Sequence, residues 1–428
     1  MRPLPYRDPS PSPTLMRLLG PVNRHLILPR ILRVARLDLP AADLARLRAA
    51  VNPDTAAFMA PGHPEFMTDW MIDKELSRRS APLMASWAAQ EIVNASPLAQ
   101  RFWLANGLIA NAPGGGGKAY SIRHVREGHG VLLHPEGAVN WQAERIAPLH
   151  PGAIDMAMHV ATAFAAERNP RPVFVVPMVW RLTFTADVSR NLVREMEHIE
   201  SARGLTVWPS RHPAGRLASL LAALLIERAR QLGLRQPDIT RAPSDGRYFD
   251  AQERLHAEIR AYLGDAYGPL GDDPLQALRT IQRGIRRRAH TAPERARRDR
   301  ELLTELHRLS HLDPALYGRD TLTQEQIAEI LKATRASLVT TGFFNRLHNV
   351  MPRAVAPRIA HIRVAEPMDI AAAVAAGAGA TSLVGALRRR LQDAQDALGA
   401  ELEPSVRRYR LQNPLAIEAE RERLTVGA

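Results

Sequence analysis

Apolar residues follow two patterns along the chain, short runs in one part and helical repeats in another. Between 52 and 185, short apolar runs are separated by turns and helices: TAAFMA, GLIANA, HGVLLHPEG and PVFVVPMVWRLTF. Runs such as VLL and VFVV, bounded by Gly and Pro, are typical of buried strands. The stretches APLMASWAAQEI and GAIDMAMHVATAFAAE are predicted to be helices. Strands that alternate with helices predict an α/β layer architecture.

From about 190 to 350 the spacing of apolar residues becomes helical. The last of these segments, LTQEQIAEILKATRASLV, has Thr323 and Gln326 in the positions of a capping box. The strand pattern returns in RIAHIRVAEPMDI, 358 to 370, which precedes a long predicted helix. We therefore expect the helical segment to be inserted into the α/β domain and the late strand, around 362 to 364, to join the first sheet.

This pattern predicts four parts. They are a basic amphipathic N-terminal segment (1–50), an α/β domain with a mixed sheet and flanking helices (51–187 and 355–400), an Arg-rich helical insertion (188–354) and a C-terminal tail (401–428).

Composition and charge narrow the possible partners. The chain has 428 residues, no cysteine and a formal net charge of +13, so disulfides and thiolate chemistry are excluded and a phosphate-bearing partner is favoured. The N-terminus lacks the apolar core of a signal peptide, and no window reaches the ~18 strongly apolar residues of a membrane span. We expect a cytoplasmic protein, peripheral at the inner membrane.

Two basic stretches each allow two interpretations. Residues 15–37 interleave Leu and Ile with five arginines, as expected either for a helix on an anionic membrane or for a surface helix packed on its own domain. Residues 279–300 carry nine arginines and two acidic residues, which fits a solvated face or a phosphate-binding or membrane-binding patch. Aromatic residues are absent from 279–300, so nucleic acid is not an expected partner.

The candidate chemistry starts from HPE, which occurs at His63-Pro64-Glu65 and again at 134–136. Both copies together could supply imidazole and carboxylate ligands for a metal, although the proline excludes helical i, i+4 ligand geometry. The alternative is that His63 pairs with Asp69. A histidine that accepts a proton from a hydroxyl, with a carboxylate that fixes its tautomer, would activate that hydroxyl as a nucleophile.

Four blocks in order resemble the glycerolipid acyltransferases, the lysophosphatidate-acyltransferase-like family: GHPEFMTD, GLIANA, VLLHPEGA and FVVPMVW. The late stretch HIRVAEPMDI also resembles the closing strand of that family. The resemblance covers about 52–185 and 355–395. It implies an acyltransferase-type sheet and transfer of a fatty acyl group from an acyl thioester of coenzyme A or acyl carrier protein to a lipid hydroxyl. It implies no metal and no redox cofactor.

By this resemblance His63 is the general base and Asp69 its orienting partner. Glu136 and Gly137 match the family's Glu-Gly pair in the acceptor site. Gly107 matches the glycine of the second block, and Pro177 matches the proline of the last.

The sequence departs from the family in three places. Five residues separate His63 from Asp69 instead of four, so Thr68 occupies the family's aspartate position, and we expect Pro64 near the start of the following helix. Pro113 replaces the arginine of the second block, and Ala138 and Val139 follow Gly137 where the third block of the family has Thr and Arg. The family uses these arginines to bind the acceptor's phosphate, so the acceptor is left open. The glycine run 114–117 with Lys118 could bind an anion instead or form a plain loop.

The sequence thus predicts an O-acyltransferase of lipid metabolism, acting on a lysophospholipid-like or other lipid acceptor at an anionic membrane surface. Two alternatives remain at this stage. One is a membrane- or nucleic-acid-binding protein that has the fold without the activity, and the other is a hydrolase of thioesters or lipids that uses the same His–Asp pair with water.

Overall fold

The computed structural model describes residues 4–416 except 82, 208, 240–246, 272 and 408. They form two compact units. The first runs up to Thr183 and adds Met351–Arg353 and Pro357–Leu402, and the second contains the described residues of Phe184–Val350, Ala354–Ala356 and 403–416. No helix in these described residues is long and apolar enough to cross a lipid bilayer.

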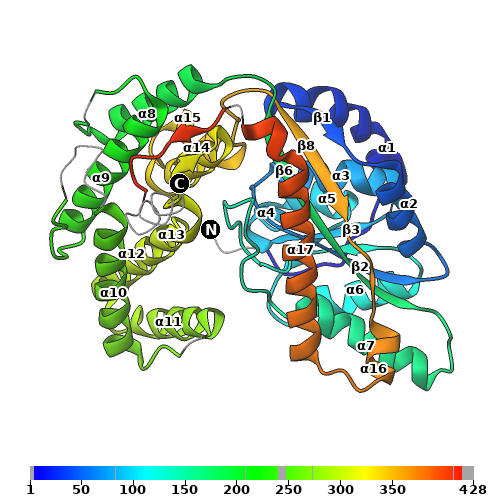
Figure 1. Ribbon diagram of the computed structural model, residues 1–428. Helices are drawn as coiled ribbons and strands as arrows, with labels where there is room; N and C mark the ends of the chain where they lie inside the picture. Colours follow the sequence, from blue (N-terminus) through cyan, green and yellow to red (C-terminus); the bar gives the residue numbers. More distant parts are fainter. Residues whose placement is uncertain are drawn as a thin grey trace. The chain divides into compact units, whose positions relative to one another are not determined.

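The first unit is built on an eight-stranded, mostly parallel sheet with helices on both faces (Figure 1). The strand order is β1-β8-β6-β2-β5-β3-β4, and β9 pairs with β6 outside this path. The strands are β1 (Val34–Asp38), β2 (Ala56–Pro61), β3 (Ala85–Ala89), β4 (Leu108–Asn111), β5 (Val131–Leu132), β6 (Val173–Phe184), β8 (Arg358–Val364) and β9 (Met368–Asp369).

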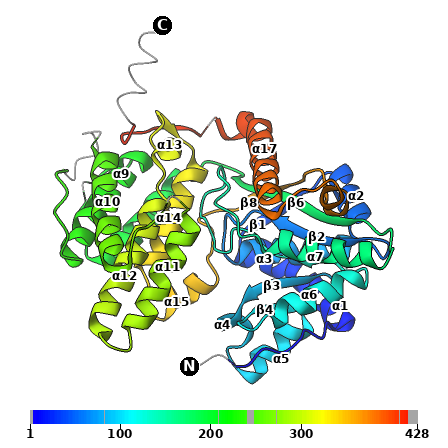
Figure 2. The same ribbon diagram turned by 90° about the horizontal axis from the view of Figure 1, so that it is seen from below.

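Alternate residues of each strand point to opposite faces, so the sheet separates two apolar cores. Phe58 belongs to one core with residues of α7 and α17, whereas its neighbour Met59 belongs to the other with residues of η1 and α3. Figure 2 shows α17 and α3 on opposite sides of β1 and β8. The helices of this unit are α1 (Pro13–Val22), the π-helix η1 (Asn23–Ile31), α2 (Ala41–Ala50), α3 (Thr68–Ser80), α4 (Gln90–Val93), α5 (Pro97–Ala105), α6 (Gly116–Arg126), α7 (Gly152–Ala166), α16 (Ile370–Ala375) and α17 (Ala380–Arg407).

The mixed α/β fold predicted from the sequence is confirmed, and so is the late strand. β8 contains residues 362–364 and lies in the sheet between β1 and β6. The prediction of a helix over APLMASWAAQEI was wrong for Ala85–Ala89, which form β3 and pair with β4 and β5, whereas Gln90–Val93 form the short helix α4. A short apolar run fits either element, and here the neighbouring strands decide.

The N-terminal basic segment packs on its own unit and also leaves an apolar face uncovered. The carboxamide of Asn23 in η1 donates to the Met71 carbonyl of α3 at 2.9 Å, and Leu28 is buried. On the other side, Leu18, Val22 and Leu26 are 68%, 40% and 51% exposed. Their spacing of four residues places them along one face of the helices.

The described residues of the second unit are mainly helical. The helices are α8 (Ser189–Arg203), α9 (Pro213–Gln231), α10 (Tyr248–Tyr267), α11 (Pro274–Arg288), α12 (Pro293–Ser310), α13 (Pro314–Tyr317), α14 (Gln324–Leu338) and α15 (Phe343–Val350), and the short strands β7 (Thr321–Leu322) and β10 (Leu411–Gln412) pair with each other. The predicted capping box of Thr323 and Gln326 starts α14.

The Arg-rich stretch 279–300 spans the end of α11 and the start of α12. One of its arginines is structural, since Arg288 pairs with the fully buried Asp299 at 2.8 Å and lies over the Tyr267 ring. The other eight are exposed: 279, 283, 286, 287, 295, 297, 298 and 300.

Candidate active site

Two histidines meet where the adjacent parallel strands β2 and β5 end. The register pairs Phe58 with Val131 and Met59 with Leu132, so the residues after both strands leave the same edge of the sheet. His63 follows β2, His134 follows β5, and their rings stack with centroids 4.0 Å apart and an interplanar angle of 20°. The carboxyl ends of strands are where open α/β sheets place their ligands.

His63 and Asp69 form the pair that the sequence predicts. The ring Nδ1 of His63 lies 2.9 Å from Oδ2 of Asp69, whose side chain is fully buried. Among the described residues the ring's Nε2 has no hydrogen-bond partner, so its lone pair is available to a bound molecule. This is the arrangement in which a carboxylate fixes the histidine tautomer and the opposite nitrogen acts as the base.

A tight turn brings Asp69 within reach although the spacing is one residue longer than in the family. The N–H of Thr68 donates to the carbonyl of Phe66 at 2.7 Å, and Met67 between them has φ 63° and ψ −44°. This resembles the rare γ-turn with a positive central φ, which is strained for a residue other than glycine. The turn starts α3 at Thr68, so the prediction that Pro64 lies near the helix start was wrong.

Asp69 is held by three donors, which favour its carboxylate form. Oδ2 accepts the backbone N–H of Glu65 at 2.8 Å as well as the His63 ring, and Oδ1 accepts the indole N–H of Trp180 at 3.0 Å. Burial raises the pKa of the Asp69 carboxyl, and the charge of His134 and the Glu65 N–H act in the opposite direction. Trp180 comes from β6 and therefore ties the dyad to the centre of the sheet.

Burial, together with the neighbouring His134, lowers the pKa of His63 well below its usual value. The ring is therefore neutral near pH 7 and able to accept a proton. Because the lower pKa also makes the protonated ring a stronger acid, the same group can return the proton to a leaving group.

Glu65 has a structural partner. Its carboxylate forms a bidentate pair with the guanidinium of Arg358, at 2.6 and 2.8 Å, and both side chains are buried. Glu65 does not cap α3, since the N-cap position is Met67 and no side chain caps the helix there. The pair joins the dyad loop to β8, 293 residues later in the chain.

Glu136 shapes the loop that contains His63. One of its oxygens accepts the backbone N–H of His63 at 2.6 Å, and the other accepts the Asn140 amide at 2.5 Å and the Ala147 N–H at 2.8 Å. Burial raises the pKa of Glu136, and these hydrogen bonds oppose the rise. Gly137 has φ 73°, and a Cβ atom there would lie 2.5 Å from the His150 ring, so the position requires glycine.

The other predicted site residues lie at different distances from the dyad. Pro177 in β6 pairs with Ala60, three residues before His63. Gly107 precedes β4 and lies at the amino end of the strands, opposite the dyad. Lys118 is exposed in the first turn of α6, after β4, and β4 is three places from β2 in the sheet order. The structure thus brings Glu136 and Pro177 to the dyad and leaves Gly107 and Lys118 apart from it.

A second histidine–aspartate pair lies beside the first and was not predicted. Nε2 of His134 is 3.1 Å from Oδ2 of Asp73, and its Nδ1 is 3.0 Å from the Gly62 carbonyl. Asp73 lies one helical turn after Asp69 in α3. The i, i+4 spacing of two acids in a predicted helix was the feature of the sequence that could have indicated a second carboxylate beside the first. The second HPE supplied the histidine.

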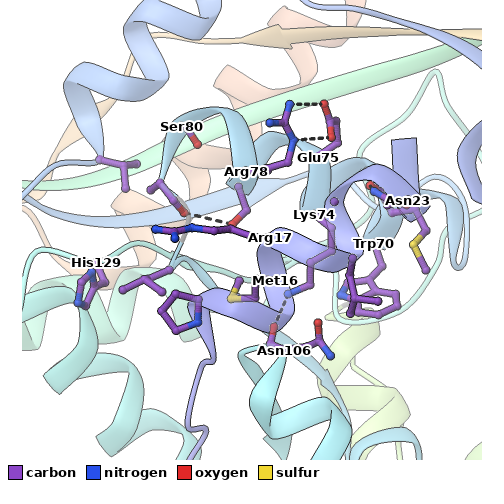
Figure 3. Close-up of a pocket in the computed structure, with 18 of the residues that line it drawn as sticks. Met16, Arg17, Asn23, Trp70, Lys74, Glu75, Arg78, Ser80, Asn106 and His129 are labelled. Atoms are coloured by element: carbon purple, nitrogen blue, oxygen red, sulfur yellow. Dashed lines mark hydrogen bonds and ion pairs between the residues drawn. The ribbon is translucent and has the colours of Figure 1, made fainter. Parts of the chain in front are cut away.

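A largely apolar pocket of about 850 Å³, the pocket behind α3, is lined by residues of α3, α1 and η1 (Figure 3). Lys74 extends along it and donates to the Asn106 carbonyl at 2.5 Å, with Trp70 beside it. Burial lowers the pKa of Lys74 to about 8, although Asp73 acts in the opposite direction. The indole N–H of Trp70 is buried with no acceptor in the described part of the chain. Met67 of the tight turn also lines this pocket, so the pocket begins next to the dyad loop.

The described residues contain no group of three or more His, Asp or Glu side chains arranged to hold a metal ion. A scan of the chain against protein-family models found no match, and a search of curated proteins found none either.

Proposed function

We propose that this protein is an O-acyltransferase that moves a fatty acyl group from an acyl thioester to the hydroxyl of a lipid. The observation that carries the proposal is the His63–Asp69 dyad with a free Nε2 at the carboxyl edge of the sheet. His63 would accept the proton of the acceptor hydroxyl as its oxygen attacks the thioester carbonyl. It would then return the proton to the sulfur as the C–S bond breaks, so that the products are an ester and a free thiol. The helical residues 188–354 would be an insertion in this acyltransferase domain.

The deciding experiment incubates the purified protein with a radiolabelled long-chain acyl-CoA or acyl carrier protein and a mixture of lysophospholipids. A labelled lipid product supports acyl transfer. Labelled free acid alone would indicate a hydrolase, with water as the acceptor. Neither product, with every donor and acceptor offered, would favour a protein that only binds membranes.

The pocket behind α3 would hold the acyl chain of the donor. Its volume lies within the range of about 300–1,000 Å³ that small-molecule sites occupy. Its walls are mainly apolar, and the Trp70 N–H and Lys74 offer donors to a polar group.

Filling this pocket should shorten the preferred acyl chain. Ala81 lines the pocket, and Ala81→Phe would place a ring in the space. We expect the ratio of turnover with a long-chain donor to turnover with a medium-chain donor to fall by about tenfold or more, because each excluded methylene loses ~0.8 kcal/mol of burial. Ile92→Phe is the matched control, since Ile92 is 37% exposed and does not line the pocket. Equal ratios in both variants and the wild type would show that the chain binds elsewhere.

The exposed face of α1 and η1 would dock on an anionic membrane. Leu18, Val22 and Leu26 would enter the lipid, and the exposed Arg17 and Arg30 would contact anionic headgroups, at ~1 kcal/mol for each basic residue. Deletion of the whole segment would not test this, because Leu32 and Val34 belong to the core and β1 belongs to the sheet.

We therefore expect the double variant Leu18→Asp/Leu26→Asp to bind phosphatidylglycerol vesicles at least about tenfold more weakly, because burial of each leucine contributes ~1.5–3 kcal/mol. Sedimentation with vesicles measures this. Wild-type binding should also weaken as salt is raised, since the headgroup contacts are screened. The control is Leu347→Asp, at a leucine that is 48% exposed in α15. Equal binding of the double variant and wild type, or equal wild-type binding to neutral vesicles, would refute the docking face.

A further inference from the structure

His134 is bonded through both of its ring nitrogens to groups that accept. Nδ1 faces the Gly62 carbonyl at 3.0 Å and Nε2 faces the Asp73 carboxyl at 3.1 Å. A carbonyl oxygen cannot donate, and a neutral imidazole carries only one N–H. Both hydrogen bonds are made when the ring is an imidazolium and Asp73 is a carboxylate, or when a neutral ring with its proton on Nδ1 faces a protonated Asp73. Burial raises the pKa of Asp73, so the surrounding charges decide between the two forms.

The charges around the ring favour this form. Burial lowers the pKa of His134, but the charge and hydrogen bond of Asp73, with Asp69 and the Gly62 carbonyl, outweigh it and raise the pKa to about 9. His134 also lowers the pKa of Glu136, in the loop after β5, so these two groups favour each other's charged form. His134 and, at the next position of α3, Lys74 lower the pKa of Asp73 against the effect of burial. The charge of Glu65, which is bound to Arg358, raises the pKa of Asp69.

We propose that His134 and Asp73 form a second buried histidine–aspartate pair, whose imidazolium lies against the ring of His63 and keeps it neutral and ready to accept a proton. His134 is then a positioning residue that acts through His63. This inference rests on the proposed acyl transfer only for its effect on turnover; the state of the two rings is independent of the reaction.

The positive charge of the His134 ring, which stacks on His63, has opposite effects on the two halves of the reaction. When His63 takes the hydroxyl proton, two imidazolium rings lie 4.0 Å apart, so the protonated state is destabilised. Proton acceptance becomes harder, whereas proton delivery to the leaving sulfur becomes easier. The pair would thus suit a reaction in which the departure of the thiolate, and not the attack of the hydroxyl, limits the rate.

The sign of the pH dependence follows from the depressed pKa of His63. The wild-type enzyme should retain its turnover number below pH 6.5 and lose it only as the pH falls through this depressed pKa. Removal of the neighbouring positive charge should raise the pKa of His63 and move the acid limb of the pH profile upward.

The test uses the double variant His134→Phe/Asp73→Leu, which removes both members of the pair together, so that neither is left as an unpaired buried ion. Nitrogen-15 NMR of protein labelled at histidine measures the titration of His63 and His134 without any substrate. We expect both nitrogens of His134 to be protonated at pH 7 in the wild type. In the double variant we expect the midpoint of His63 to rise by about one pH unit or more.

The pH profile of kcat is the second measurement, with Thr68→Val as the control. Thr68 belongs to the tight turn at Met67, and its buried hydroxyl has no partner in the described structure. The change alters no charge. We expect the acid limb to move upward in the double variant and to stay in place in the control. A purely structural role would lower kcat at every pH and leave the midpoint unchanged.

A neutral His134 at pH 7, or a His63 midpoint that is unchanged in the double variant, would overturn the proposal. If no variant and no wild-type preparation transfers an acyl group, the proposed function fails while the NMR titration still decides the charge of the pair.

Discussion

Replacement of His63 by alanine is expected to lower acyl transfer by ~10²–10⁴-fold, because the change removes the proposed general base. The loss should appear in kcat, with the KM for the acyl thioester little changed, since the acyl pocket behind α3 is intact. Initial rates with a saturating acyl donor measure it.

The matched control for this variant is Thr68→Val, five residues away in the same turn. Valine has nearly the same shape and removes a buried hydroxyl that has no partner among the described residues, so turnover should stay close to wild type. Full activity of His63→Ala would end the acyltransferase proposal. A loss in both variants would show that the turn, rather than the imidazole, had been damaged.

Asp69→Asn is expected to cost a comparable factor, up to about 10⁴-fold, through loss of the charge and of the tautomer. The carboxylate oxygens accept three N–H groups, so the amide nitrogen must face one of those donors. If it faces His63, its N–H takes the place of the acceptor, the ring proton moves to Nε2, and the lone pair that serves as the base is lost.

The loss of turnover in Asp69→Asn should be larger than any loss of folded protein. Thermal unfolding of the variant is therefore measured together with its rate. Trp180→Phe removes one donor to Asp69 but leaves the charge, and we expect a much smaller effect on kcat. Glu65→Gln is a poor control because it breaks a buried pair with Arg358, which typically destabilises a protein by ~3–5 kcal/mol. Near wild-type turnover in Asp69→Asn would show that the dyad had been misassigned.

The sequence predicted the strands that position the dyad because their apolar runs are strong local signals. TAAFMA and HGVLLHPEG contain β2 and β5, and the two residues that it selected, His63 and Asp69, are in contact. The geometry of the contact could not be read from spacing, because neither five nor six residues brings two side chains to one face of a helix. The tight turn at Met67 supplies it, and nothing in its composition marks a positive φ.

What the sequence did not predict depends on contacts between distant residues. The residues of β3 were predicted to be helical because their short apolar run fits either element. They form a strand through pairing with β4 and β5. The role of Glu65 depends on Arg358, and the pairing of His134 with Asp73 depends on the adjacency of β2 and β5. Each of these contacts joins segments whose proximity is set by the sheet order and by no local pattern.

The position of β8 between β1 and β6 has a consequence for synthesis on the ribosome. The segment from the end of β6 at 184 to the start of β8 at 358 is 174 residues long, so at about 5–20 residues per second β8 is made roughly 9–35 s after β6. During that interval β1 and one edge of β6 are without the strand that joins them, and Glu65 is without Arg358. The nascent chain therefore carries two open strand edges and an incomplete dyad loop while the whole helical unit is translated, which makes this period the one in which pairing with other chains is most favoured.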